Sequence, residues 1–233
     1  MKMEKVRPII QKAIEEKRWL FEPEAMEILK IYEISVPDYC FSNDLQEVMK
    51  GAKSIGYPVV LKIVSPDILH KSDAGGVKLN LTNEDEVRKA YLEIMANAKK
   101  FAPEADIRGI IIYPMVESGL ETIIGVTDDA QFGRAAMFGL GGVFVELLKD
   151  VAFRILPLTP SDALAMIKEI KGYPLLDGIR GEVPKDIASL VTTIVKISNL
   201  CSYFPEIKEI DLNPTYVYEQ GIAVVDTRIK VGR

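Results

Sequence analysis

Three nitrogen-bearing side chains stand close together in the sequence, one near the end of an apolar run and two on the polar loop that follows it. His70 is the only histidine in the 233 residues, and Lys62 and Lys71 stand before and after it. Imidazole is largely neutral near pH 7 and can form covalent intermediates as a nucleophile, while lysine binds phosphate as a point charge. A lone loop histidine is more often a plain hydrogen-bonding residue. It cannot form a metal site without carboxylates.

Lys62 lies within the apolar run 58–64, which predicts a buried strand. A charge buried in such a strand is costly unless it is paired. A phosphate group is a natural partner for it, and Lys71 and Arg154 favour that interpretation. The alternative is an edge strand on which Lys62 faces solvent.

Oxygen ligands are concentrated near the C-terminus. Glu209, Asp211 and Asn213 alternate along a predicted strand, so all three point to one face. Asp226 ends the hairpin that follows and returns beside them. Carboxylate and amide oxygens suit Mg²⁺, which uses one or two protein carboxylates together with substrate phosphates. We favour a metal site here over acidic residues that simply face solvent.

Two glycine clusters stand beside these groups. The run 139–142 could present backbone N–H groups to an anion, but it has no P-loop pattern, and no Gly-x-Gly-x-x-Gly joins a strand to a helix. A tight turn is the simpler interpretation. Gly75 and Gly76 end the histidine loop and release the chain into the next strand.

The elements that must position these residues follow from hydrophobic periodicity and helix caps. Asn43 with Gln46, and Asn83 with Glu86, are predicted capping boxes. The sequence predicts helices over 6–18, 24–32, 43–55, 83–101, 161–170 and 184–203, strands over 34–41, 58–64, 77–81, 109–116, 121–127, 134–138, 151–156 and 207–214, and a hairpin over 215–226.

Composition excludes several classes of function. The chain is 48% hydrophobic and 27% charged with a net charge of −5, which argues against a general nucleic-acid binder. No apolar run approaches membrane-spanning length. The charged N-terminus is no secretion signal, and the two cysteines show no metal spacing. We expect a cytoplasmic protein that binds neither nucleic acid nor membrane.

Taken together, these residues resemble the ATP-grasp family, and more closely the beta subunits of the ADP-forming acetyl-CoA synthetases. The resemblance covers nearly the whole chain. Its most specific motifs are residues 69–77, 121–126 with 131–133, 138–146 and 209–214. It implies an α+β ATP-grasp fold in which two α/β subdomains clamp a nucleotide. The expected domains are an N-terminal helical extension over 1–21, an N-terminal subdomain with the phosphohistidine loop over 22–108, and a C-terminal subdomain with the Mg²⁺ and nucleotide site over 109–233.

The resemblance also implies roles for single residues, with ATP or ADP and Mg²⁺ as cofactors. His70 would carry a phosphoryl group to ADP, and Asp211 would lie beside it. Asn213 and Asp226 would bind the metal. The nucleotide would be bound by Lys62, by backbone groups near Met115 and Val116, by Glu121 near the ribose or the wall of the site, and by Arg154 at the phosphates.

The chain has no second histidine and no dinucleotide-type glycine loop for CoA. The resemblance therefore implies an alpha subunit that supplies the CoA site and a first phosphohistidine, in an α₂β₂ assembly. Helix 1–18 and the apolar segment 19–21 are candidate contacts with it. The acid is left open among acetate, branched-chain and aryl acids.

Two other functions remain open at this point. A free-standing ATP-grasp carboxylate ligase would use Lys62, Asn213 and Asp226 but would not need His70. A non-catalytic nucleotide-sensing subunit would bind ATP without becoming phosphorylated. A succinate-specific beta subunit is a near relative, and the His-Lys-Ser-Asp sequence at 70–73 argues against it.

Overall fold

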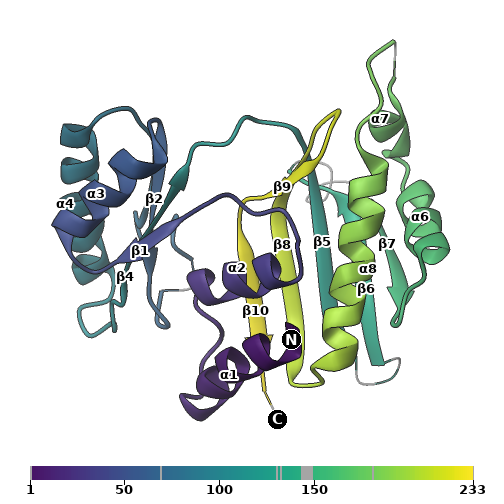
Figure 1. Cartoon of the computed structure of the whole chain (residues 1–233), viewed down its shortest axis with the longest axis horizontal. Coiled ribbons are helices and arrows are strands. Elements are labelled where there is room, and N and C mark those ends of the chain that lie inside the picture. The colour runs from purple at the N-terminus through teal and green to yellow at the C-terminus, as the bar shows by residue number, and fades with distance from the viewer. Residues whose placement is uncertain are drawn as a thin grey trace. The chain divides into compact units, whose positions relative to one another are not determined.

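A computed structural model describes residues 2–68, 70–129, 131, 133–142, 149–179 and 181–232. The chain forms two compact units. The first consists of Met1–Leu20, Glu24–Val36 and Ser118–Arg233, and the second of Phe21–Pro23 and Pro37–Glu117. Figure 1 labels the elements of both units. Residues 69, 132 and 143–146, which belong to motifs noted above, lie outside the described residues.

The second unit contains a four-stranded antiparallel sheet with the strand order β1-β4-β2-β3. Its strands are β1 (Cys40–Ser42), β2 (Val59–Val64), β3 (Val77–Leu81) and β4 (Gly109–Pro114). Helices α3 (Leu45–Ile55) and α4 (Glu84–Phe101) pack side by side against it (Figure 1). Val59, Leu61 and Ile63 of β2 belong to the core shared with these helices. Lys62 alternates with them and therefore faces the other side of the sheet.

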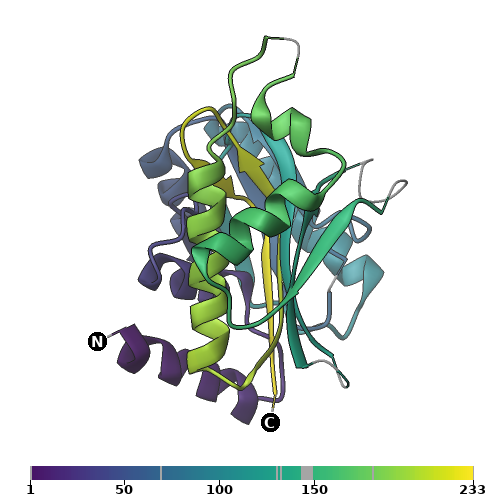
Figure 2. The ribbon, with the colours of Figure 1, turned by 90° about the vertical axis from the view of Figure 1, so that its right-hand side faces the viewer.

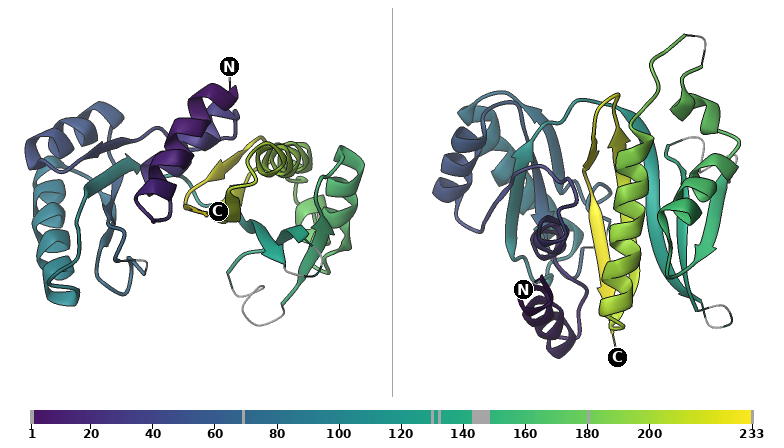
Figure 3. Two further views of the ribbon diagram at one scale, coloured as in Figure 1. Left: turned by 90° about the horizontal axis from the view of Figure 1, so that it is seen from below. Right: turned by 45° about the vertical axis from the view of Figure 1, so that its right-hand side comes forward.

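The first unit contains a six-stranded sheet with the order β10-β8-β5-β6-β7, in which β9 also pairs with β8. The strands are β5 (Leu120–Asp129), β6 (Gly133–Leu140), β7 (Val151–Ile155), β8 (Ile207–Val217), β9 (Ile222–Val224) and β10 (Thr227–Val231). The helices are α1 (Lys2–Glu15), α2 (Glu22–Ile31, from Glu24 on), α6 (Pro160–Glu169), α7 (Tyr173–Asp177) and α8 (Ile187–Tyr203). Figures 2 and 3 show α8 running along this sheet.

Strand register separates the two faces of this sheet. Ile229, Ile210, Val126 and Ala136 lie opposite one another in one row, and all belong to the apolar core that the helices cover. The neighbouring row points to the other face. It contains Arg228, Asp211, Gly125, Met137 and Phe153. We call this second face the Asp211 face.

The two units differ from the domain boundaries expected at residues 22 and 109. Strand β4 bonds to both β1 and β2 in the middle of the four-stranded sheet, so it belongs to the second unit. Helix α1 is not a separate extension, because Val6, Ile10 and Ala13 are buried in the core of the first unit. The same core includes Ala25, Ile28, Leu29 and Tyr32 of α2.

The predicted helix caps are only partly right. Helix α3 is capped by Asp44, whose Oδ1 accepts hydrogen bonds from the N–H groups of Gln46 at 2.9 Å and Glu47 at 3.0 Å. Asn43 was therefore the wrong cap, since a carboxylate next to it is an equally good acceptor and also favours the positive end of the helix. Asn83 does cap α4, but the Glu86 carboxylate accepts from Thr82 instead of completing the box.

Other boundaries also shift. The strand predicted over 34–41 is confined to Cys40–Ser42, and the last helix begins at Ile187 instead of residue 184. The predicted hairpin is confirmed by the pairing of β8 with β9. No helix among the described residues is both long and apolar enough to cross a membrane.

Candidate active site

Lys62 is buried, as the apolar strand predicts, and its charge is compensated within the chain. Its Nζ lies 3.2 Å from Oε1 of Glu22, and 5.0 Å from the centre of the Tyr113 ring. The other carboxylate oxygen of Glu22 accepts a hydrogen bond from Lys71. Glu22, Lys62 and Lys71 all belong to the second unit. A carboxylate therefore already provides the partner that burial of Lys62 requires.

His70 is exposed at the start of a hydrogen-bonded turn that spans residues 70–76. Its carbonyl oxygen accepts from the N–H of Ala74 at 3.2 Å, and the carbonyl of Lys71 accepts from Gly76 at 2.8 Å. The N–H of Ile63 donates to the carbonyl of Gly76 at 2.8 Å, which joins the end of the turn to β2. The backbone of the turn is thus fixed while the imidazole remains accessible.

The two glycines of this turn are required for different reasons. Gly75 has φ +61°, in the left-handed region that side chains with a Cβ rarely adopt. A Cβ on Gly76 would lie 2.5 Å from the Cγ2 of Ile63, so the chain can approach β2 only without a side chain. The predicted release of the chain into β3 is confirmed.

Met115 and Val116 follow β4, where the resemblance implies contacts with the adenine ring. The N–H of Met115 donates to the carbonyl of Pro58 at 2.8 Å, so this donor already has a partner within the chain. The Met115 side chain is 38% exposed and Val116 is half-buried. Of the two residues, Val116 is thus the better source of a backbone N–H for a nucleotide base.

Asp211 lies on β8 directly across from Arg228 of β10 and Gly125 of β5. Burial raises the pKa of Asp211 above its ordinary value; the Arg228 guanidinium opposes this, and the Asp226 carboxylate adds to it. Strand register puts Arg228 directly across from Asp211, and Asp226 immediately precedes Thr227, which lies across from Leu212. Arg228 was not predicted from the sequence; it lies on β10, which begins one residue after Asp226.

Asn213 and Asp226 also meet. The N–H of Asn213 donates to the carbonyl of Asp226 at 3.2 Å, and the Asn213 side chain is exposed. The β5–β8 register shifts between the pairs Thr122–Thr215 and Ile124–Leu212, which puts Asn213 in an irregular part of the strand before its cis bond to Pro214. The alternation of side chains along a regular strand therefore does not assign Asn213 to a face of the sheet.

Asn213 and Asp226 fit a Mg²⁺ site in which the phosphates of a substrate provide some of the ligands. Among the described residues there is no group of three or more His, Cys, Asp and Glu side chains that could hold a metal alone. One carboxylate from Asp226 and an amide oxygen from Asn213 match the few protein ligands that Mg²⁺ takes when phosphates and waters complete its shell. Glu209 is not part of this set, because it pairs with Lys230 at 2.7 Å.

Glu121 lies near the start of β5, opposite Tyr216 of β8. Its Oε1 is 3.5 Å from the Tyr216 hydroxyl, and its carbonyl accepts from the N–H of Gly141 at 2.8 Å. A Cβ on Gly141 would lie 2.9 Å from the Cβ of Glu121. The first part of the glycine run thus packs tightly against Glu121, as a tight turn would.

Arg154 is not placed with these groups. It lies opposite Ala136 in the row that faces the helix-covered core, and its guanidinium pairs with Glu169 of α6. Phe153, not Arg154, points to the Asp211 face. Arg154 is therefore not placed with Asp211, because strand register puts the two on opposite faces of one sheet.

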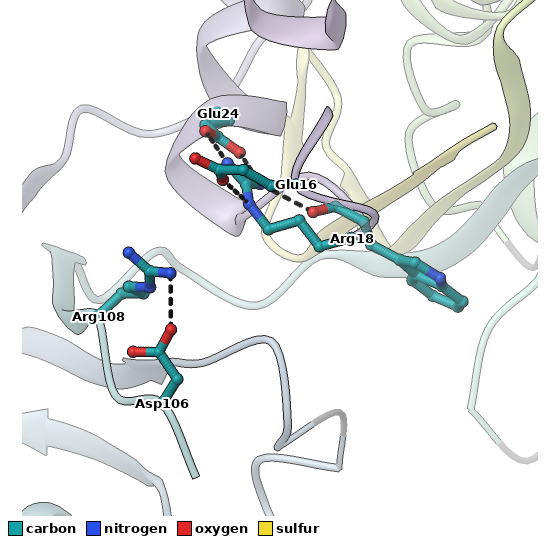
Figure 4. Close-up of polar contacts among 6 residues, drawn as sticks. Glu16, Arg18, Glu24, Asp106 and Arg108 are labelled. Carbon is teal, nitrogen blue, oxygen red and sulfur yellow. Dashed lines mark hydrogen bonds and ion pairs between the residues drawn. The ribbon is translucent and has the colours of Figure 1, made fainter. Parts of the chain in front are cut away.

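The apolar segment 19–21 is engaged within the chain. The N–H of Leu20 donates to the carbonyl of Ile229 at 3.1 Å, and Lys230 lies 5.4 Å from the Trp19 ring. Arg18 donates to both carboxylate oxygens of Glu24, at 2.6 and 2.8 Å (Figure 4). These contacts fix the connection from α1 to α2, which is a structural role for this segment.

The predicted site residues are thus divided between the units. Lys62, His70, Met115 and Val116 belong to the second unit, and Glu121, Arg154, Asp211, Asn213 and Asp226 to the first. Glu22 was missed because an acidic residue before a proline at a helix start is common, and nothing in the sequence indicates its burial.

Comparison with known proteins assigns the chain to a family. The family model of the ATP-grasp domain matches residues 12–231. The chain is 55% identical to "Acetate--CoA ligase [ADP-forming] I subunit beta" of Pyrococcus furiosus, over 97% of both chains.

Two solved structures of acetyl-coenzyme A synthetase 1 from Ca. Korarchaeum cryptofilum are each 44% identical and cover 97% of this chain and 99% of theirs. One, with TM-score 0.89, has a phosphorylated phosphohistidine segment in the site I orientation. The other, with TM-score 0.84, contains coenzyme A and Mg-AMPPCP, and its phosphohistidine segment points towards the nucleotide binding site.

Proposed function

The chain belongs to the ATP-grasp family and, within it, to the beta subunits of the ADP-forming acetate–CoA ligases, and from this premise we propose that it is the nucleotide-binding subunit of an ADP-forming acyl-CoA synthetase. The overall reaction converts acyl-CoA, ADP and phosphate into a carboxylic acid, ATP and CoA. The observation that supports this proposal most directly is the exposed side chain of His70 on a turn whose backbone and neighbouring lysine are fixed.

His70 carries the phosphoryl group in this proposal. An imidazole nitrogen attacks phosphorus, the bond from phosphorus to the donor breaks, and a P–N bond forms. The terminal phosphate oxygen of ADP then attacks the same phosphorus, and the P–N bond breaks to give ATP and free imidazole. Lys71 stands next to the charged group, and a lysine is a suitable counter-ion for phosphate.

The first unit supplies the oxygen ligands. Asn213 and Asp226 would hold Mg²⁺, which would supply positive charge to the nucleotide phosphates. Asp211 acts on the phosphoryl group during its transfer to ADP, and Glu121 binds the nucleotide. Arg228 is the phosphate-side cation, because it lies across from Asp211, whereas Arg154 is paired on the other face.

An alpha subunit completes the enzyme. The sequence holds one histidine, so the first phosphohistidine and the CoA site must come from elsewhere. The Pyrococcus furiosus relative is named as a beta subunit, and an enzyme with a beta subunit has at least one other subunit, which agrees with this requirement. We extend the proposal to an α₂β₂ assembly located in the cytoplasm.

The test is phosphorylation of the chain itself. We expect γ-labelled ATP and Mg²⁺ to label the wild-type chain, in the presence of an alpha subunit, in a form that is labile in acid and stable in base, as a phosphoramidate is. His70→Ala should carry no label, while its affinity for Mg-nucleotide stays within about twofold, since an exposed side chain contributes little to folding.

Two results would contradict the proposal. Label that persists in His70→Ala would place the phosphoryl group on another residue. Nucleotide binding without any label on the wild type would instead favour a nucleotide-sensing subunit. An ATP-grasp carboxylate ligase is distinguished by turnover that survives the loss of His70.

A further inference from the structure

Glu22 is a buried carboxylate shared by two lysines. Its side chain is 1% exposed, and those of Lys62 and Lys71 are 8% and 15% exposed. One carboxylate oxygen faces each ammonium group. Removing one member of such a buried charge cluster leaves the others uncompensated, which is costly. All three residues are therefore needed to keep the buried charges paired. With one carboxylate and two ammonium groups, the cluster carries one net positive charge.

The cluster is connected to the backbone of the His70 turn at two points. Lys71 directly follows His70, and its carbonyl accepts from the N–H of Gly76 at 2.8 Å. Lys62 lies opposite Val77 on the strand that leads into the turn. Glu22 thus contacts the chain before the turn and within it. No other part of the described turn has a salt bridge to a buried carboxylate.

We propose that Glu22 is a positioning residue for phosphoryl transfer, which fixes the turn over residues 70–76 by binding Lys71 and aligns Lys62 through the same carboxylate. This inference rests on the proposed function of His70. A phosphoryl group on His70 brings a second anion to Lys71. Lys62 keeps Glu22 as its partner at that stage, so no lysine of the cluster is left buried and unpaired in either state of the histidine.

Hydrogen exchange of the full chain tests the structural half of this proposal. In Glu22→Gln, we expect the amides of Ala74, Gly75 and Gly76 to exchange about tenfold faster, as loss of a charge-assisted hydrogen bond implies. Amides of β5 and β8, which belong to the other unit, should be unchanged. Glu27→Gln is the matched control: it removes the same charge from an exposed position of the same helix and should change exchange less than twofold.

A double-mutant cycle separates positioning from general destabilisation. Lys71→Met should accelerate the amides of residues 74–76 to the same extent as Glu22→Gln, and the double variant should show no further increase there, because both changes remove the contact between Glu22 and Lys71. Additive effects would overturn the proposal. Should Glu22→Gln fail to fold, Lys71→Met carries the exchange test, since its side chain is the most exposed of the three.

Labelling of His70, with the alpha subunit present, tests the functional half. We expect Glu22→Gln to be labelled about tenfold more slowly than the wild type and than Glu27→Gln. An equal labelling rate, or unchanged exchange at residues 74–76, overturns the role of Glu22 and leaves the proposed function intact. Absence of label from the wild type is a different result, which overturns the proposed function and with it the part of Glu22 in transfer.

Discussion

At the scale of single residues, the two arginines of the first unit show how much the face of a strand decides. Arg154 and Arg228 both lie on strands of the same sheet, and both are half-buried. Arg154 pairs with Glu169 on the helix-covered side, whereas Arg228 lies across from Asp211. A guanidinium beside carboxylates is suited to a phosphate that arrives with its own metal ion. Arg154, the arginine predicted from the sequence, is thus the one that forms an ion pair on the helix-covered side of the sheet.

These two arginines form a matched pair for mutation. We expect Arg228→Gln to weaken binding of Mg-ADP about tenfold, or ~1.4 kcal/mol, since hydrogen bonds to charged groups contribute about this much. Arg154→Gln should change the affinity less than twofold. Calorimetric titration with Mg-ADP measures both values. A larger loss in Arg154→Gln than in Arg228→Gln would reverse the assignment.

At the scale of elements, Asp186 links helix α8 to the hairpin of β8 and β9. Its carboxylate accepts from the N–H of Ser189 at 2.9 Å and from the N–H of Gly221 at 2.7 Å. These backbone hydrogen bonds hold the pKa of Asp186 below its ordinary value. One side chain therefore caps a helix and fixes the turn that returns the chain toward Asp226. Such a cap typically contributes about 1 kcal/mol.

The stabilisation by Asp186 should depend on pH. Because the pKa is lower in the folded state, the contribution is fully present above the pKa of the unfolded chain, about 3.9, and is lost as the pH falls through the lower folded-state value. We expect Asp186→Ala to lose about 1–2 kcal/mol at pH 7 and progressively less below pH 4.

Urea unfolding at several pH values measures this difference. Asp186→Asn is the matched variant, because it keeps an acceptor oxygen but has no charge to titrate. Its deficit relative to the wild type should also shrink in acid, since the wild type loses the charge there. A deficit of Asp186→Ala that stays constant from pH 7 to pH 3 would show that the charge of Asp186 adds nothing to the stability of the fold.

At the scale of the whole molecule, the chain has a complete core for each unit but an incomplete set of chemical groups. Each unit has its own cluster of buried apolar residues, which explains how a chain of 233 residues can fold. The sequence holds one histidine, whereas the transfer proposed above uses two phosphohistidines. In that proposal another subunit provides the second one.

Turnover should therefore require the partner. We expect the chain alone to bind Mg-ADP but to release no CoA from acetyl-CoA in the presence of ADP and phosphate. Addition of an alpha subunit should restore release of the thiol, which a thiol reagent detects continuously. His70→Ala with the same alpha subunit is the control for release that bypasses this chain. Full activity of the chain alone would refute the requirement.

The sequence by itself determined the elements and the His70 turn, because both depend on local patterns. Apolar periodicity predicted most helices and strands, and the pair Gly75–Gly76 marked a turn that no other residues could form. The choice between two neighbouring cap residues was harder to predict: Asp44, and not Asn43, caps α3. Motifs also allowed the family to be identified, and the comparisons confirm it.

Only the tertiary structure decided which charges meet. Glu22 lies 40 residues from Lys62 in sequence, and their contact depends on how the start of one helix meets a strand of the second unit. Arg228 and Arg154 are alike in type and in strand setting, but the register of the sheet puts them on opposite faces. The energy of a buried charge depends on its partners in space, and a sequence specifies such partners only through the complete fold.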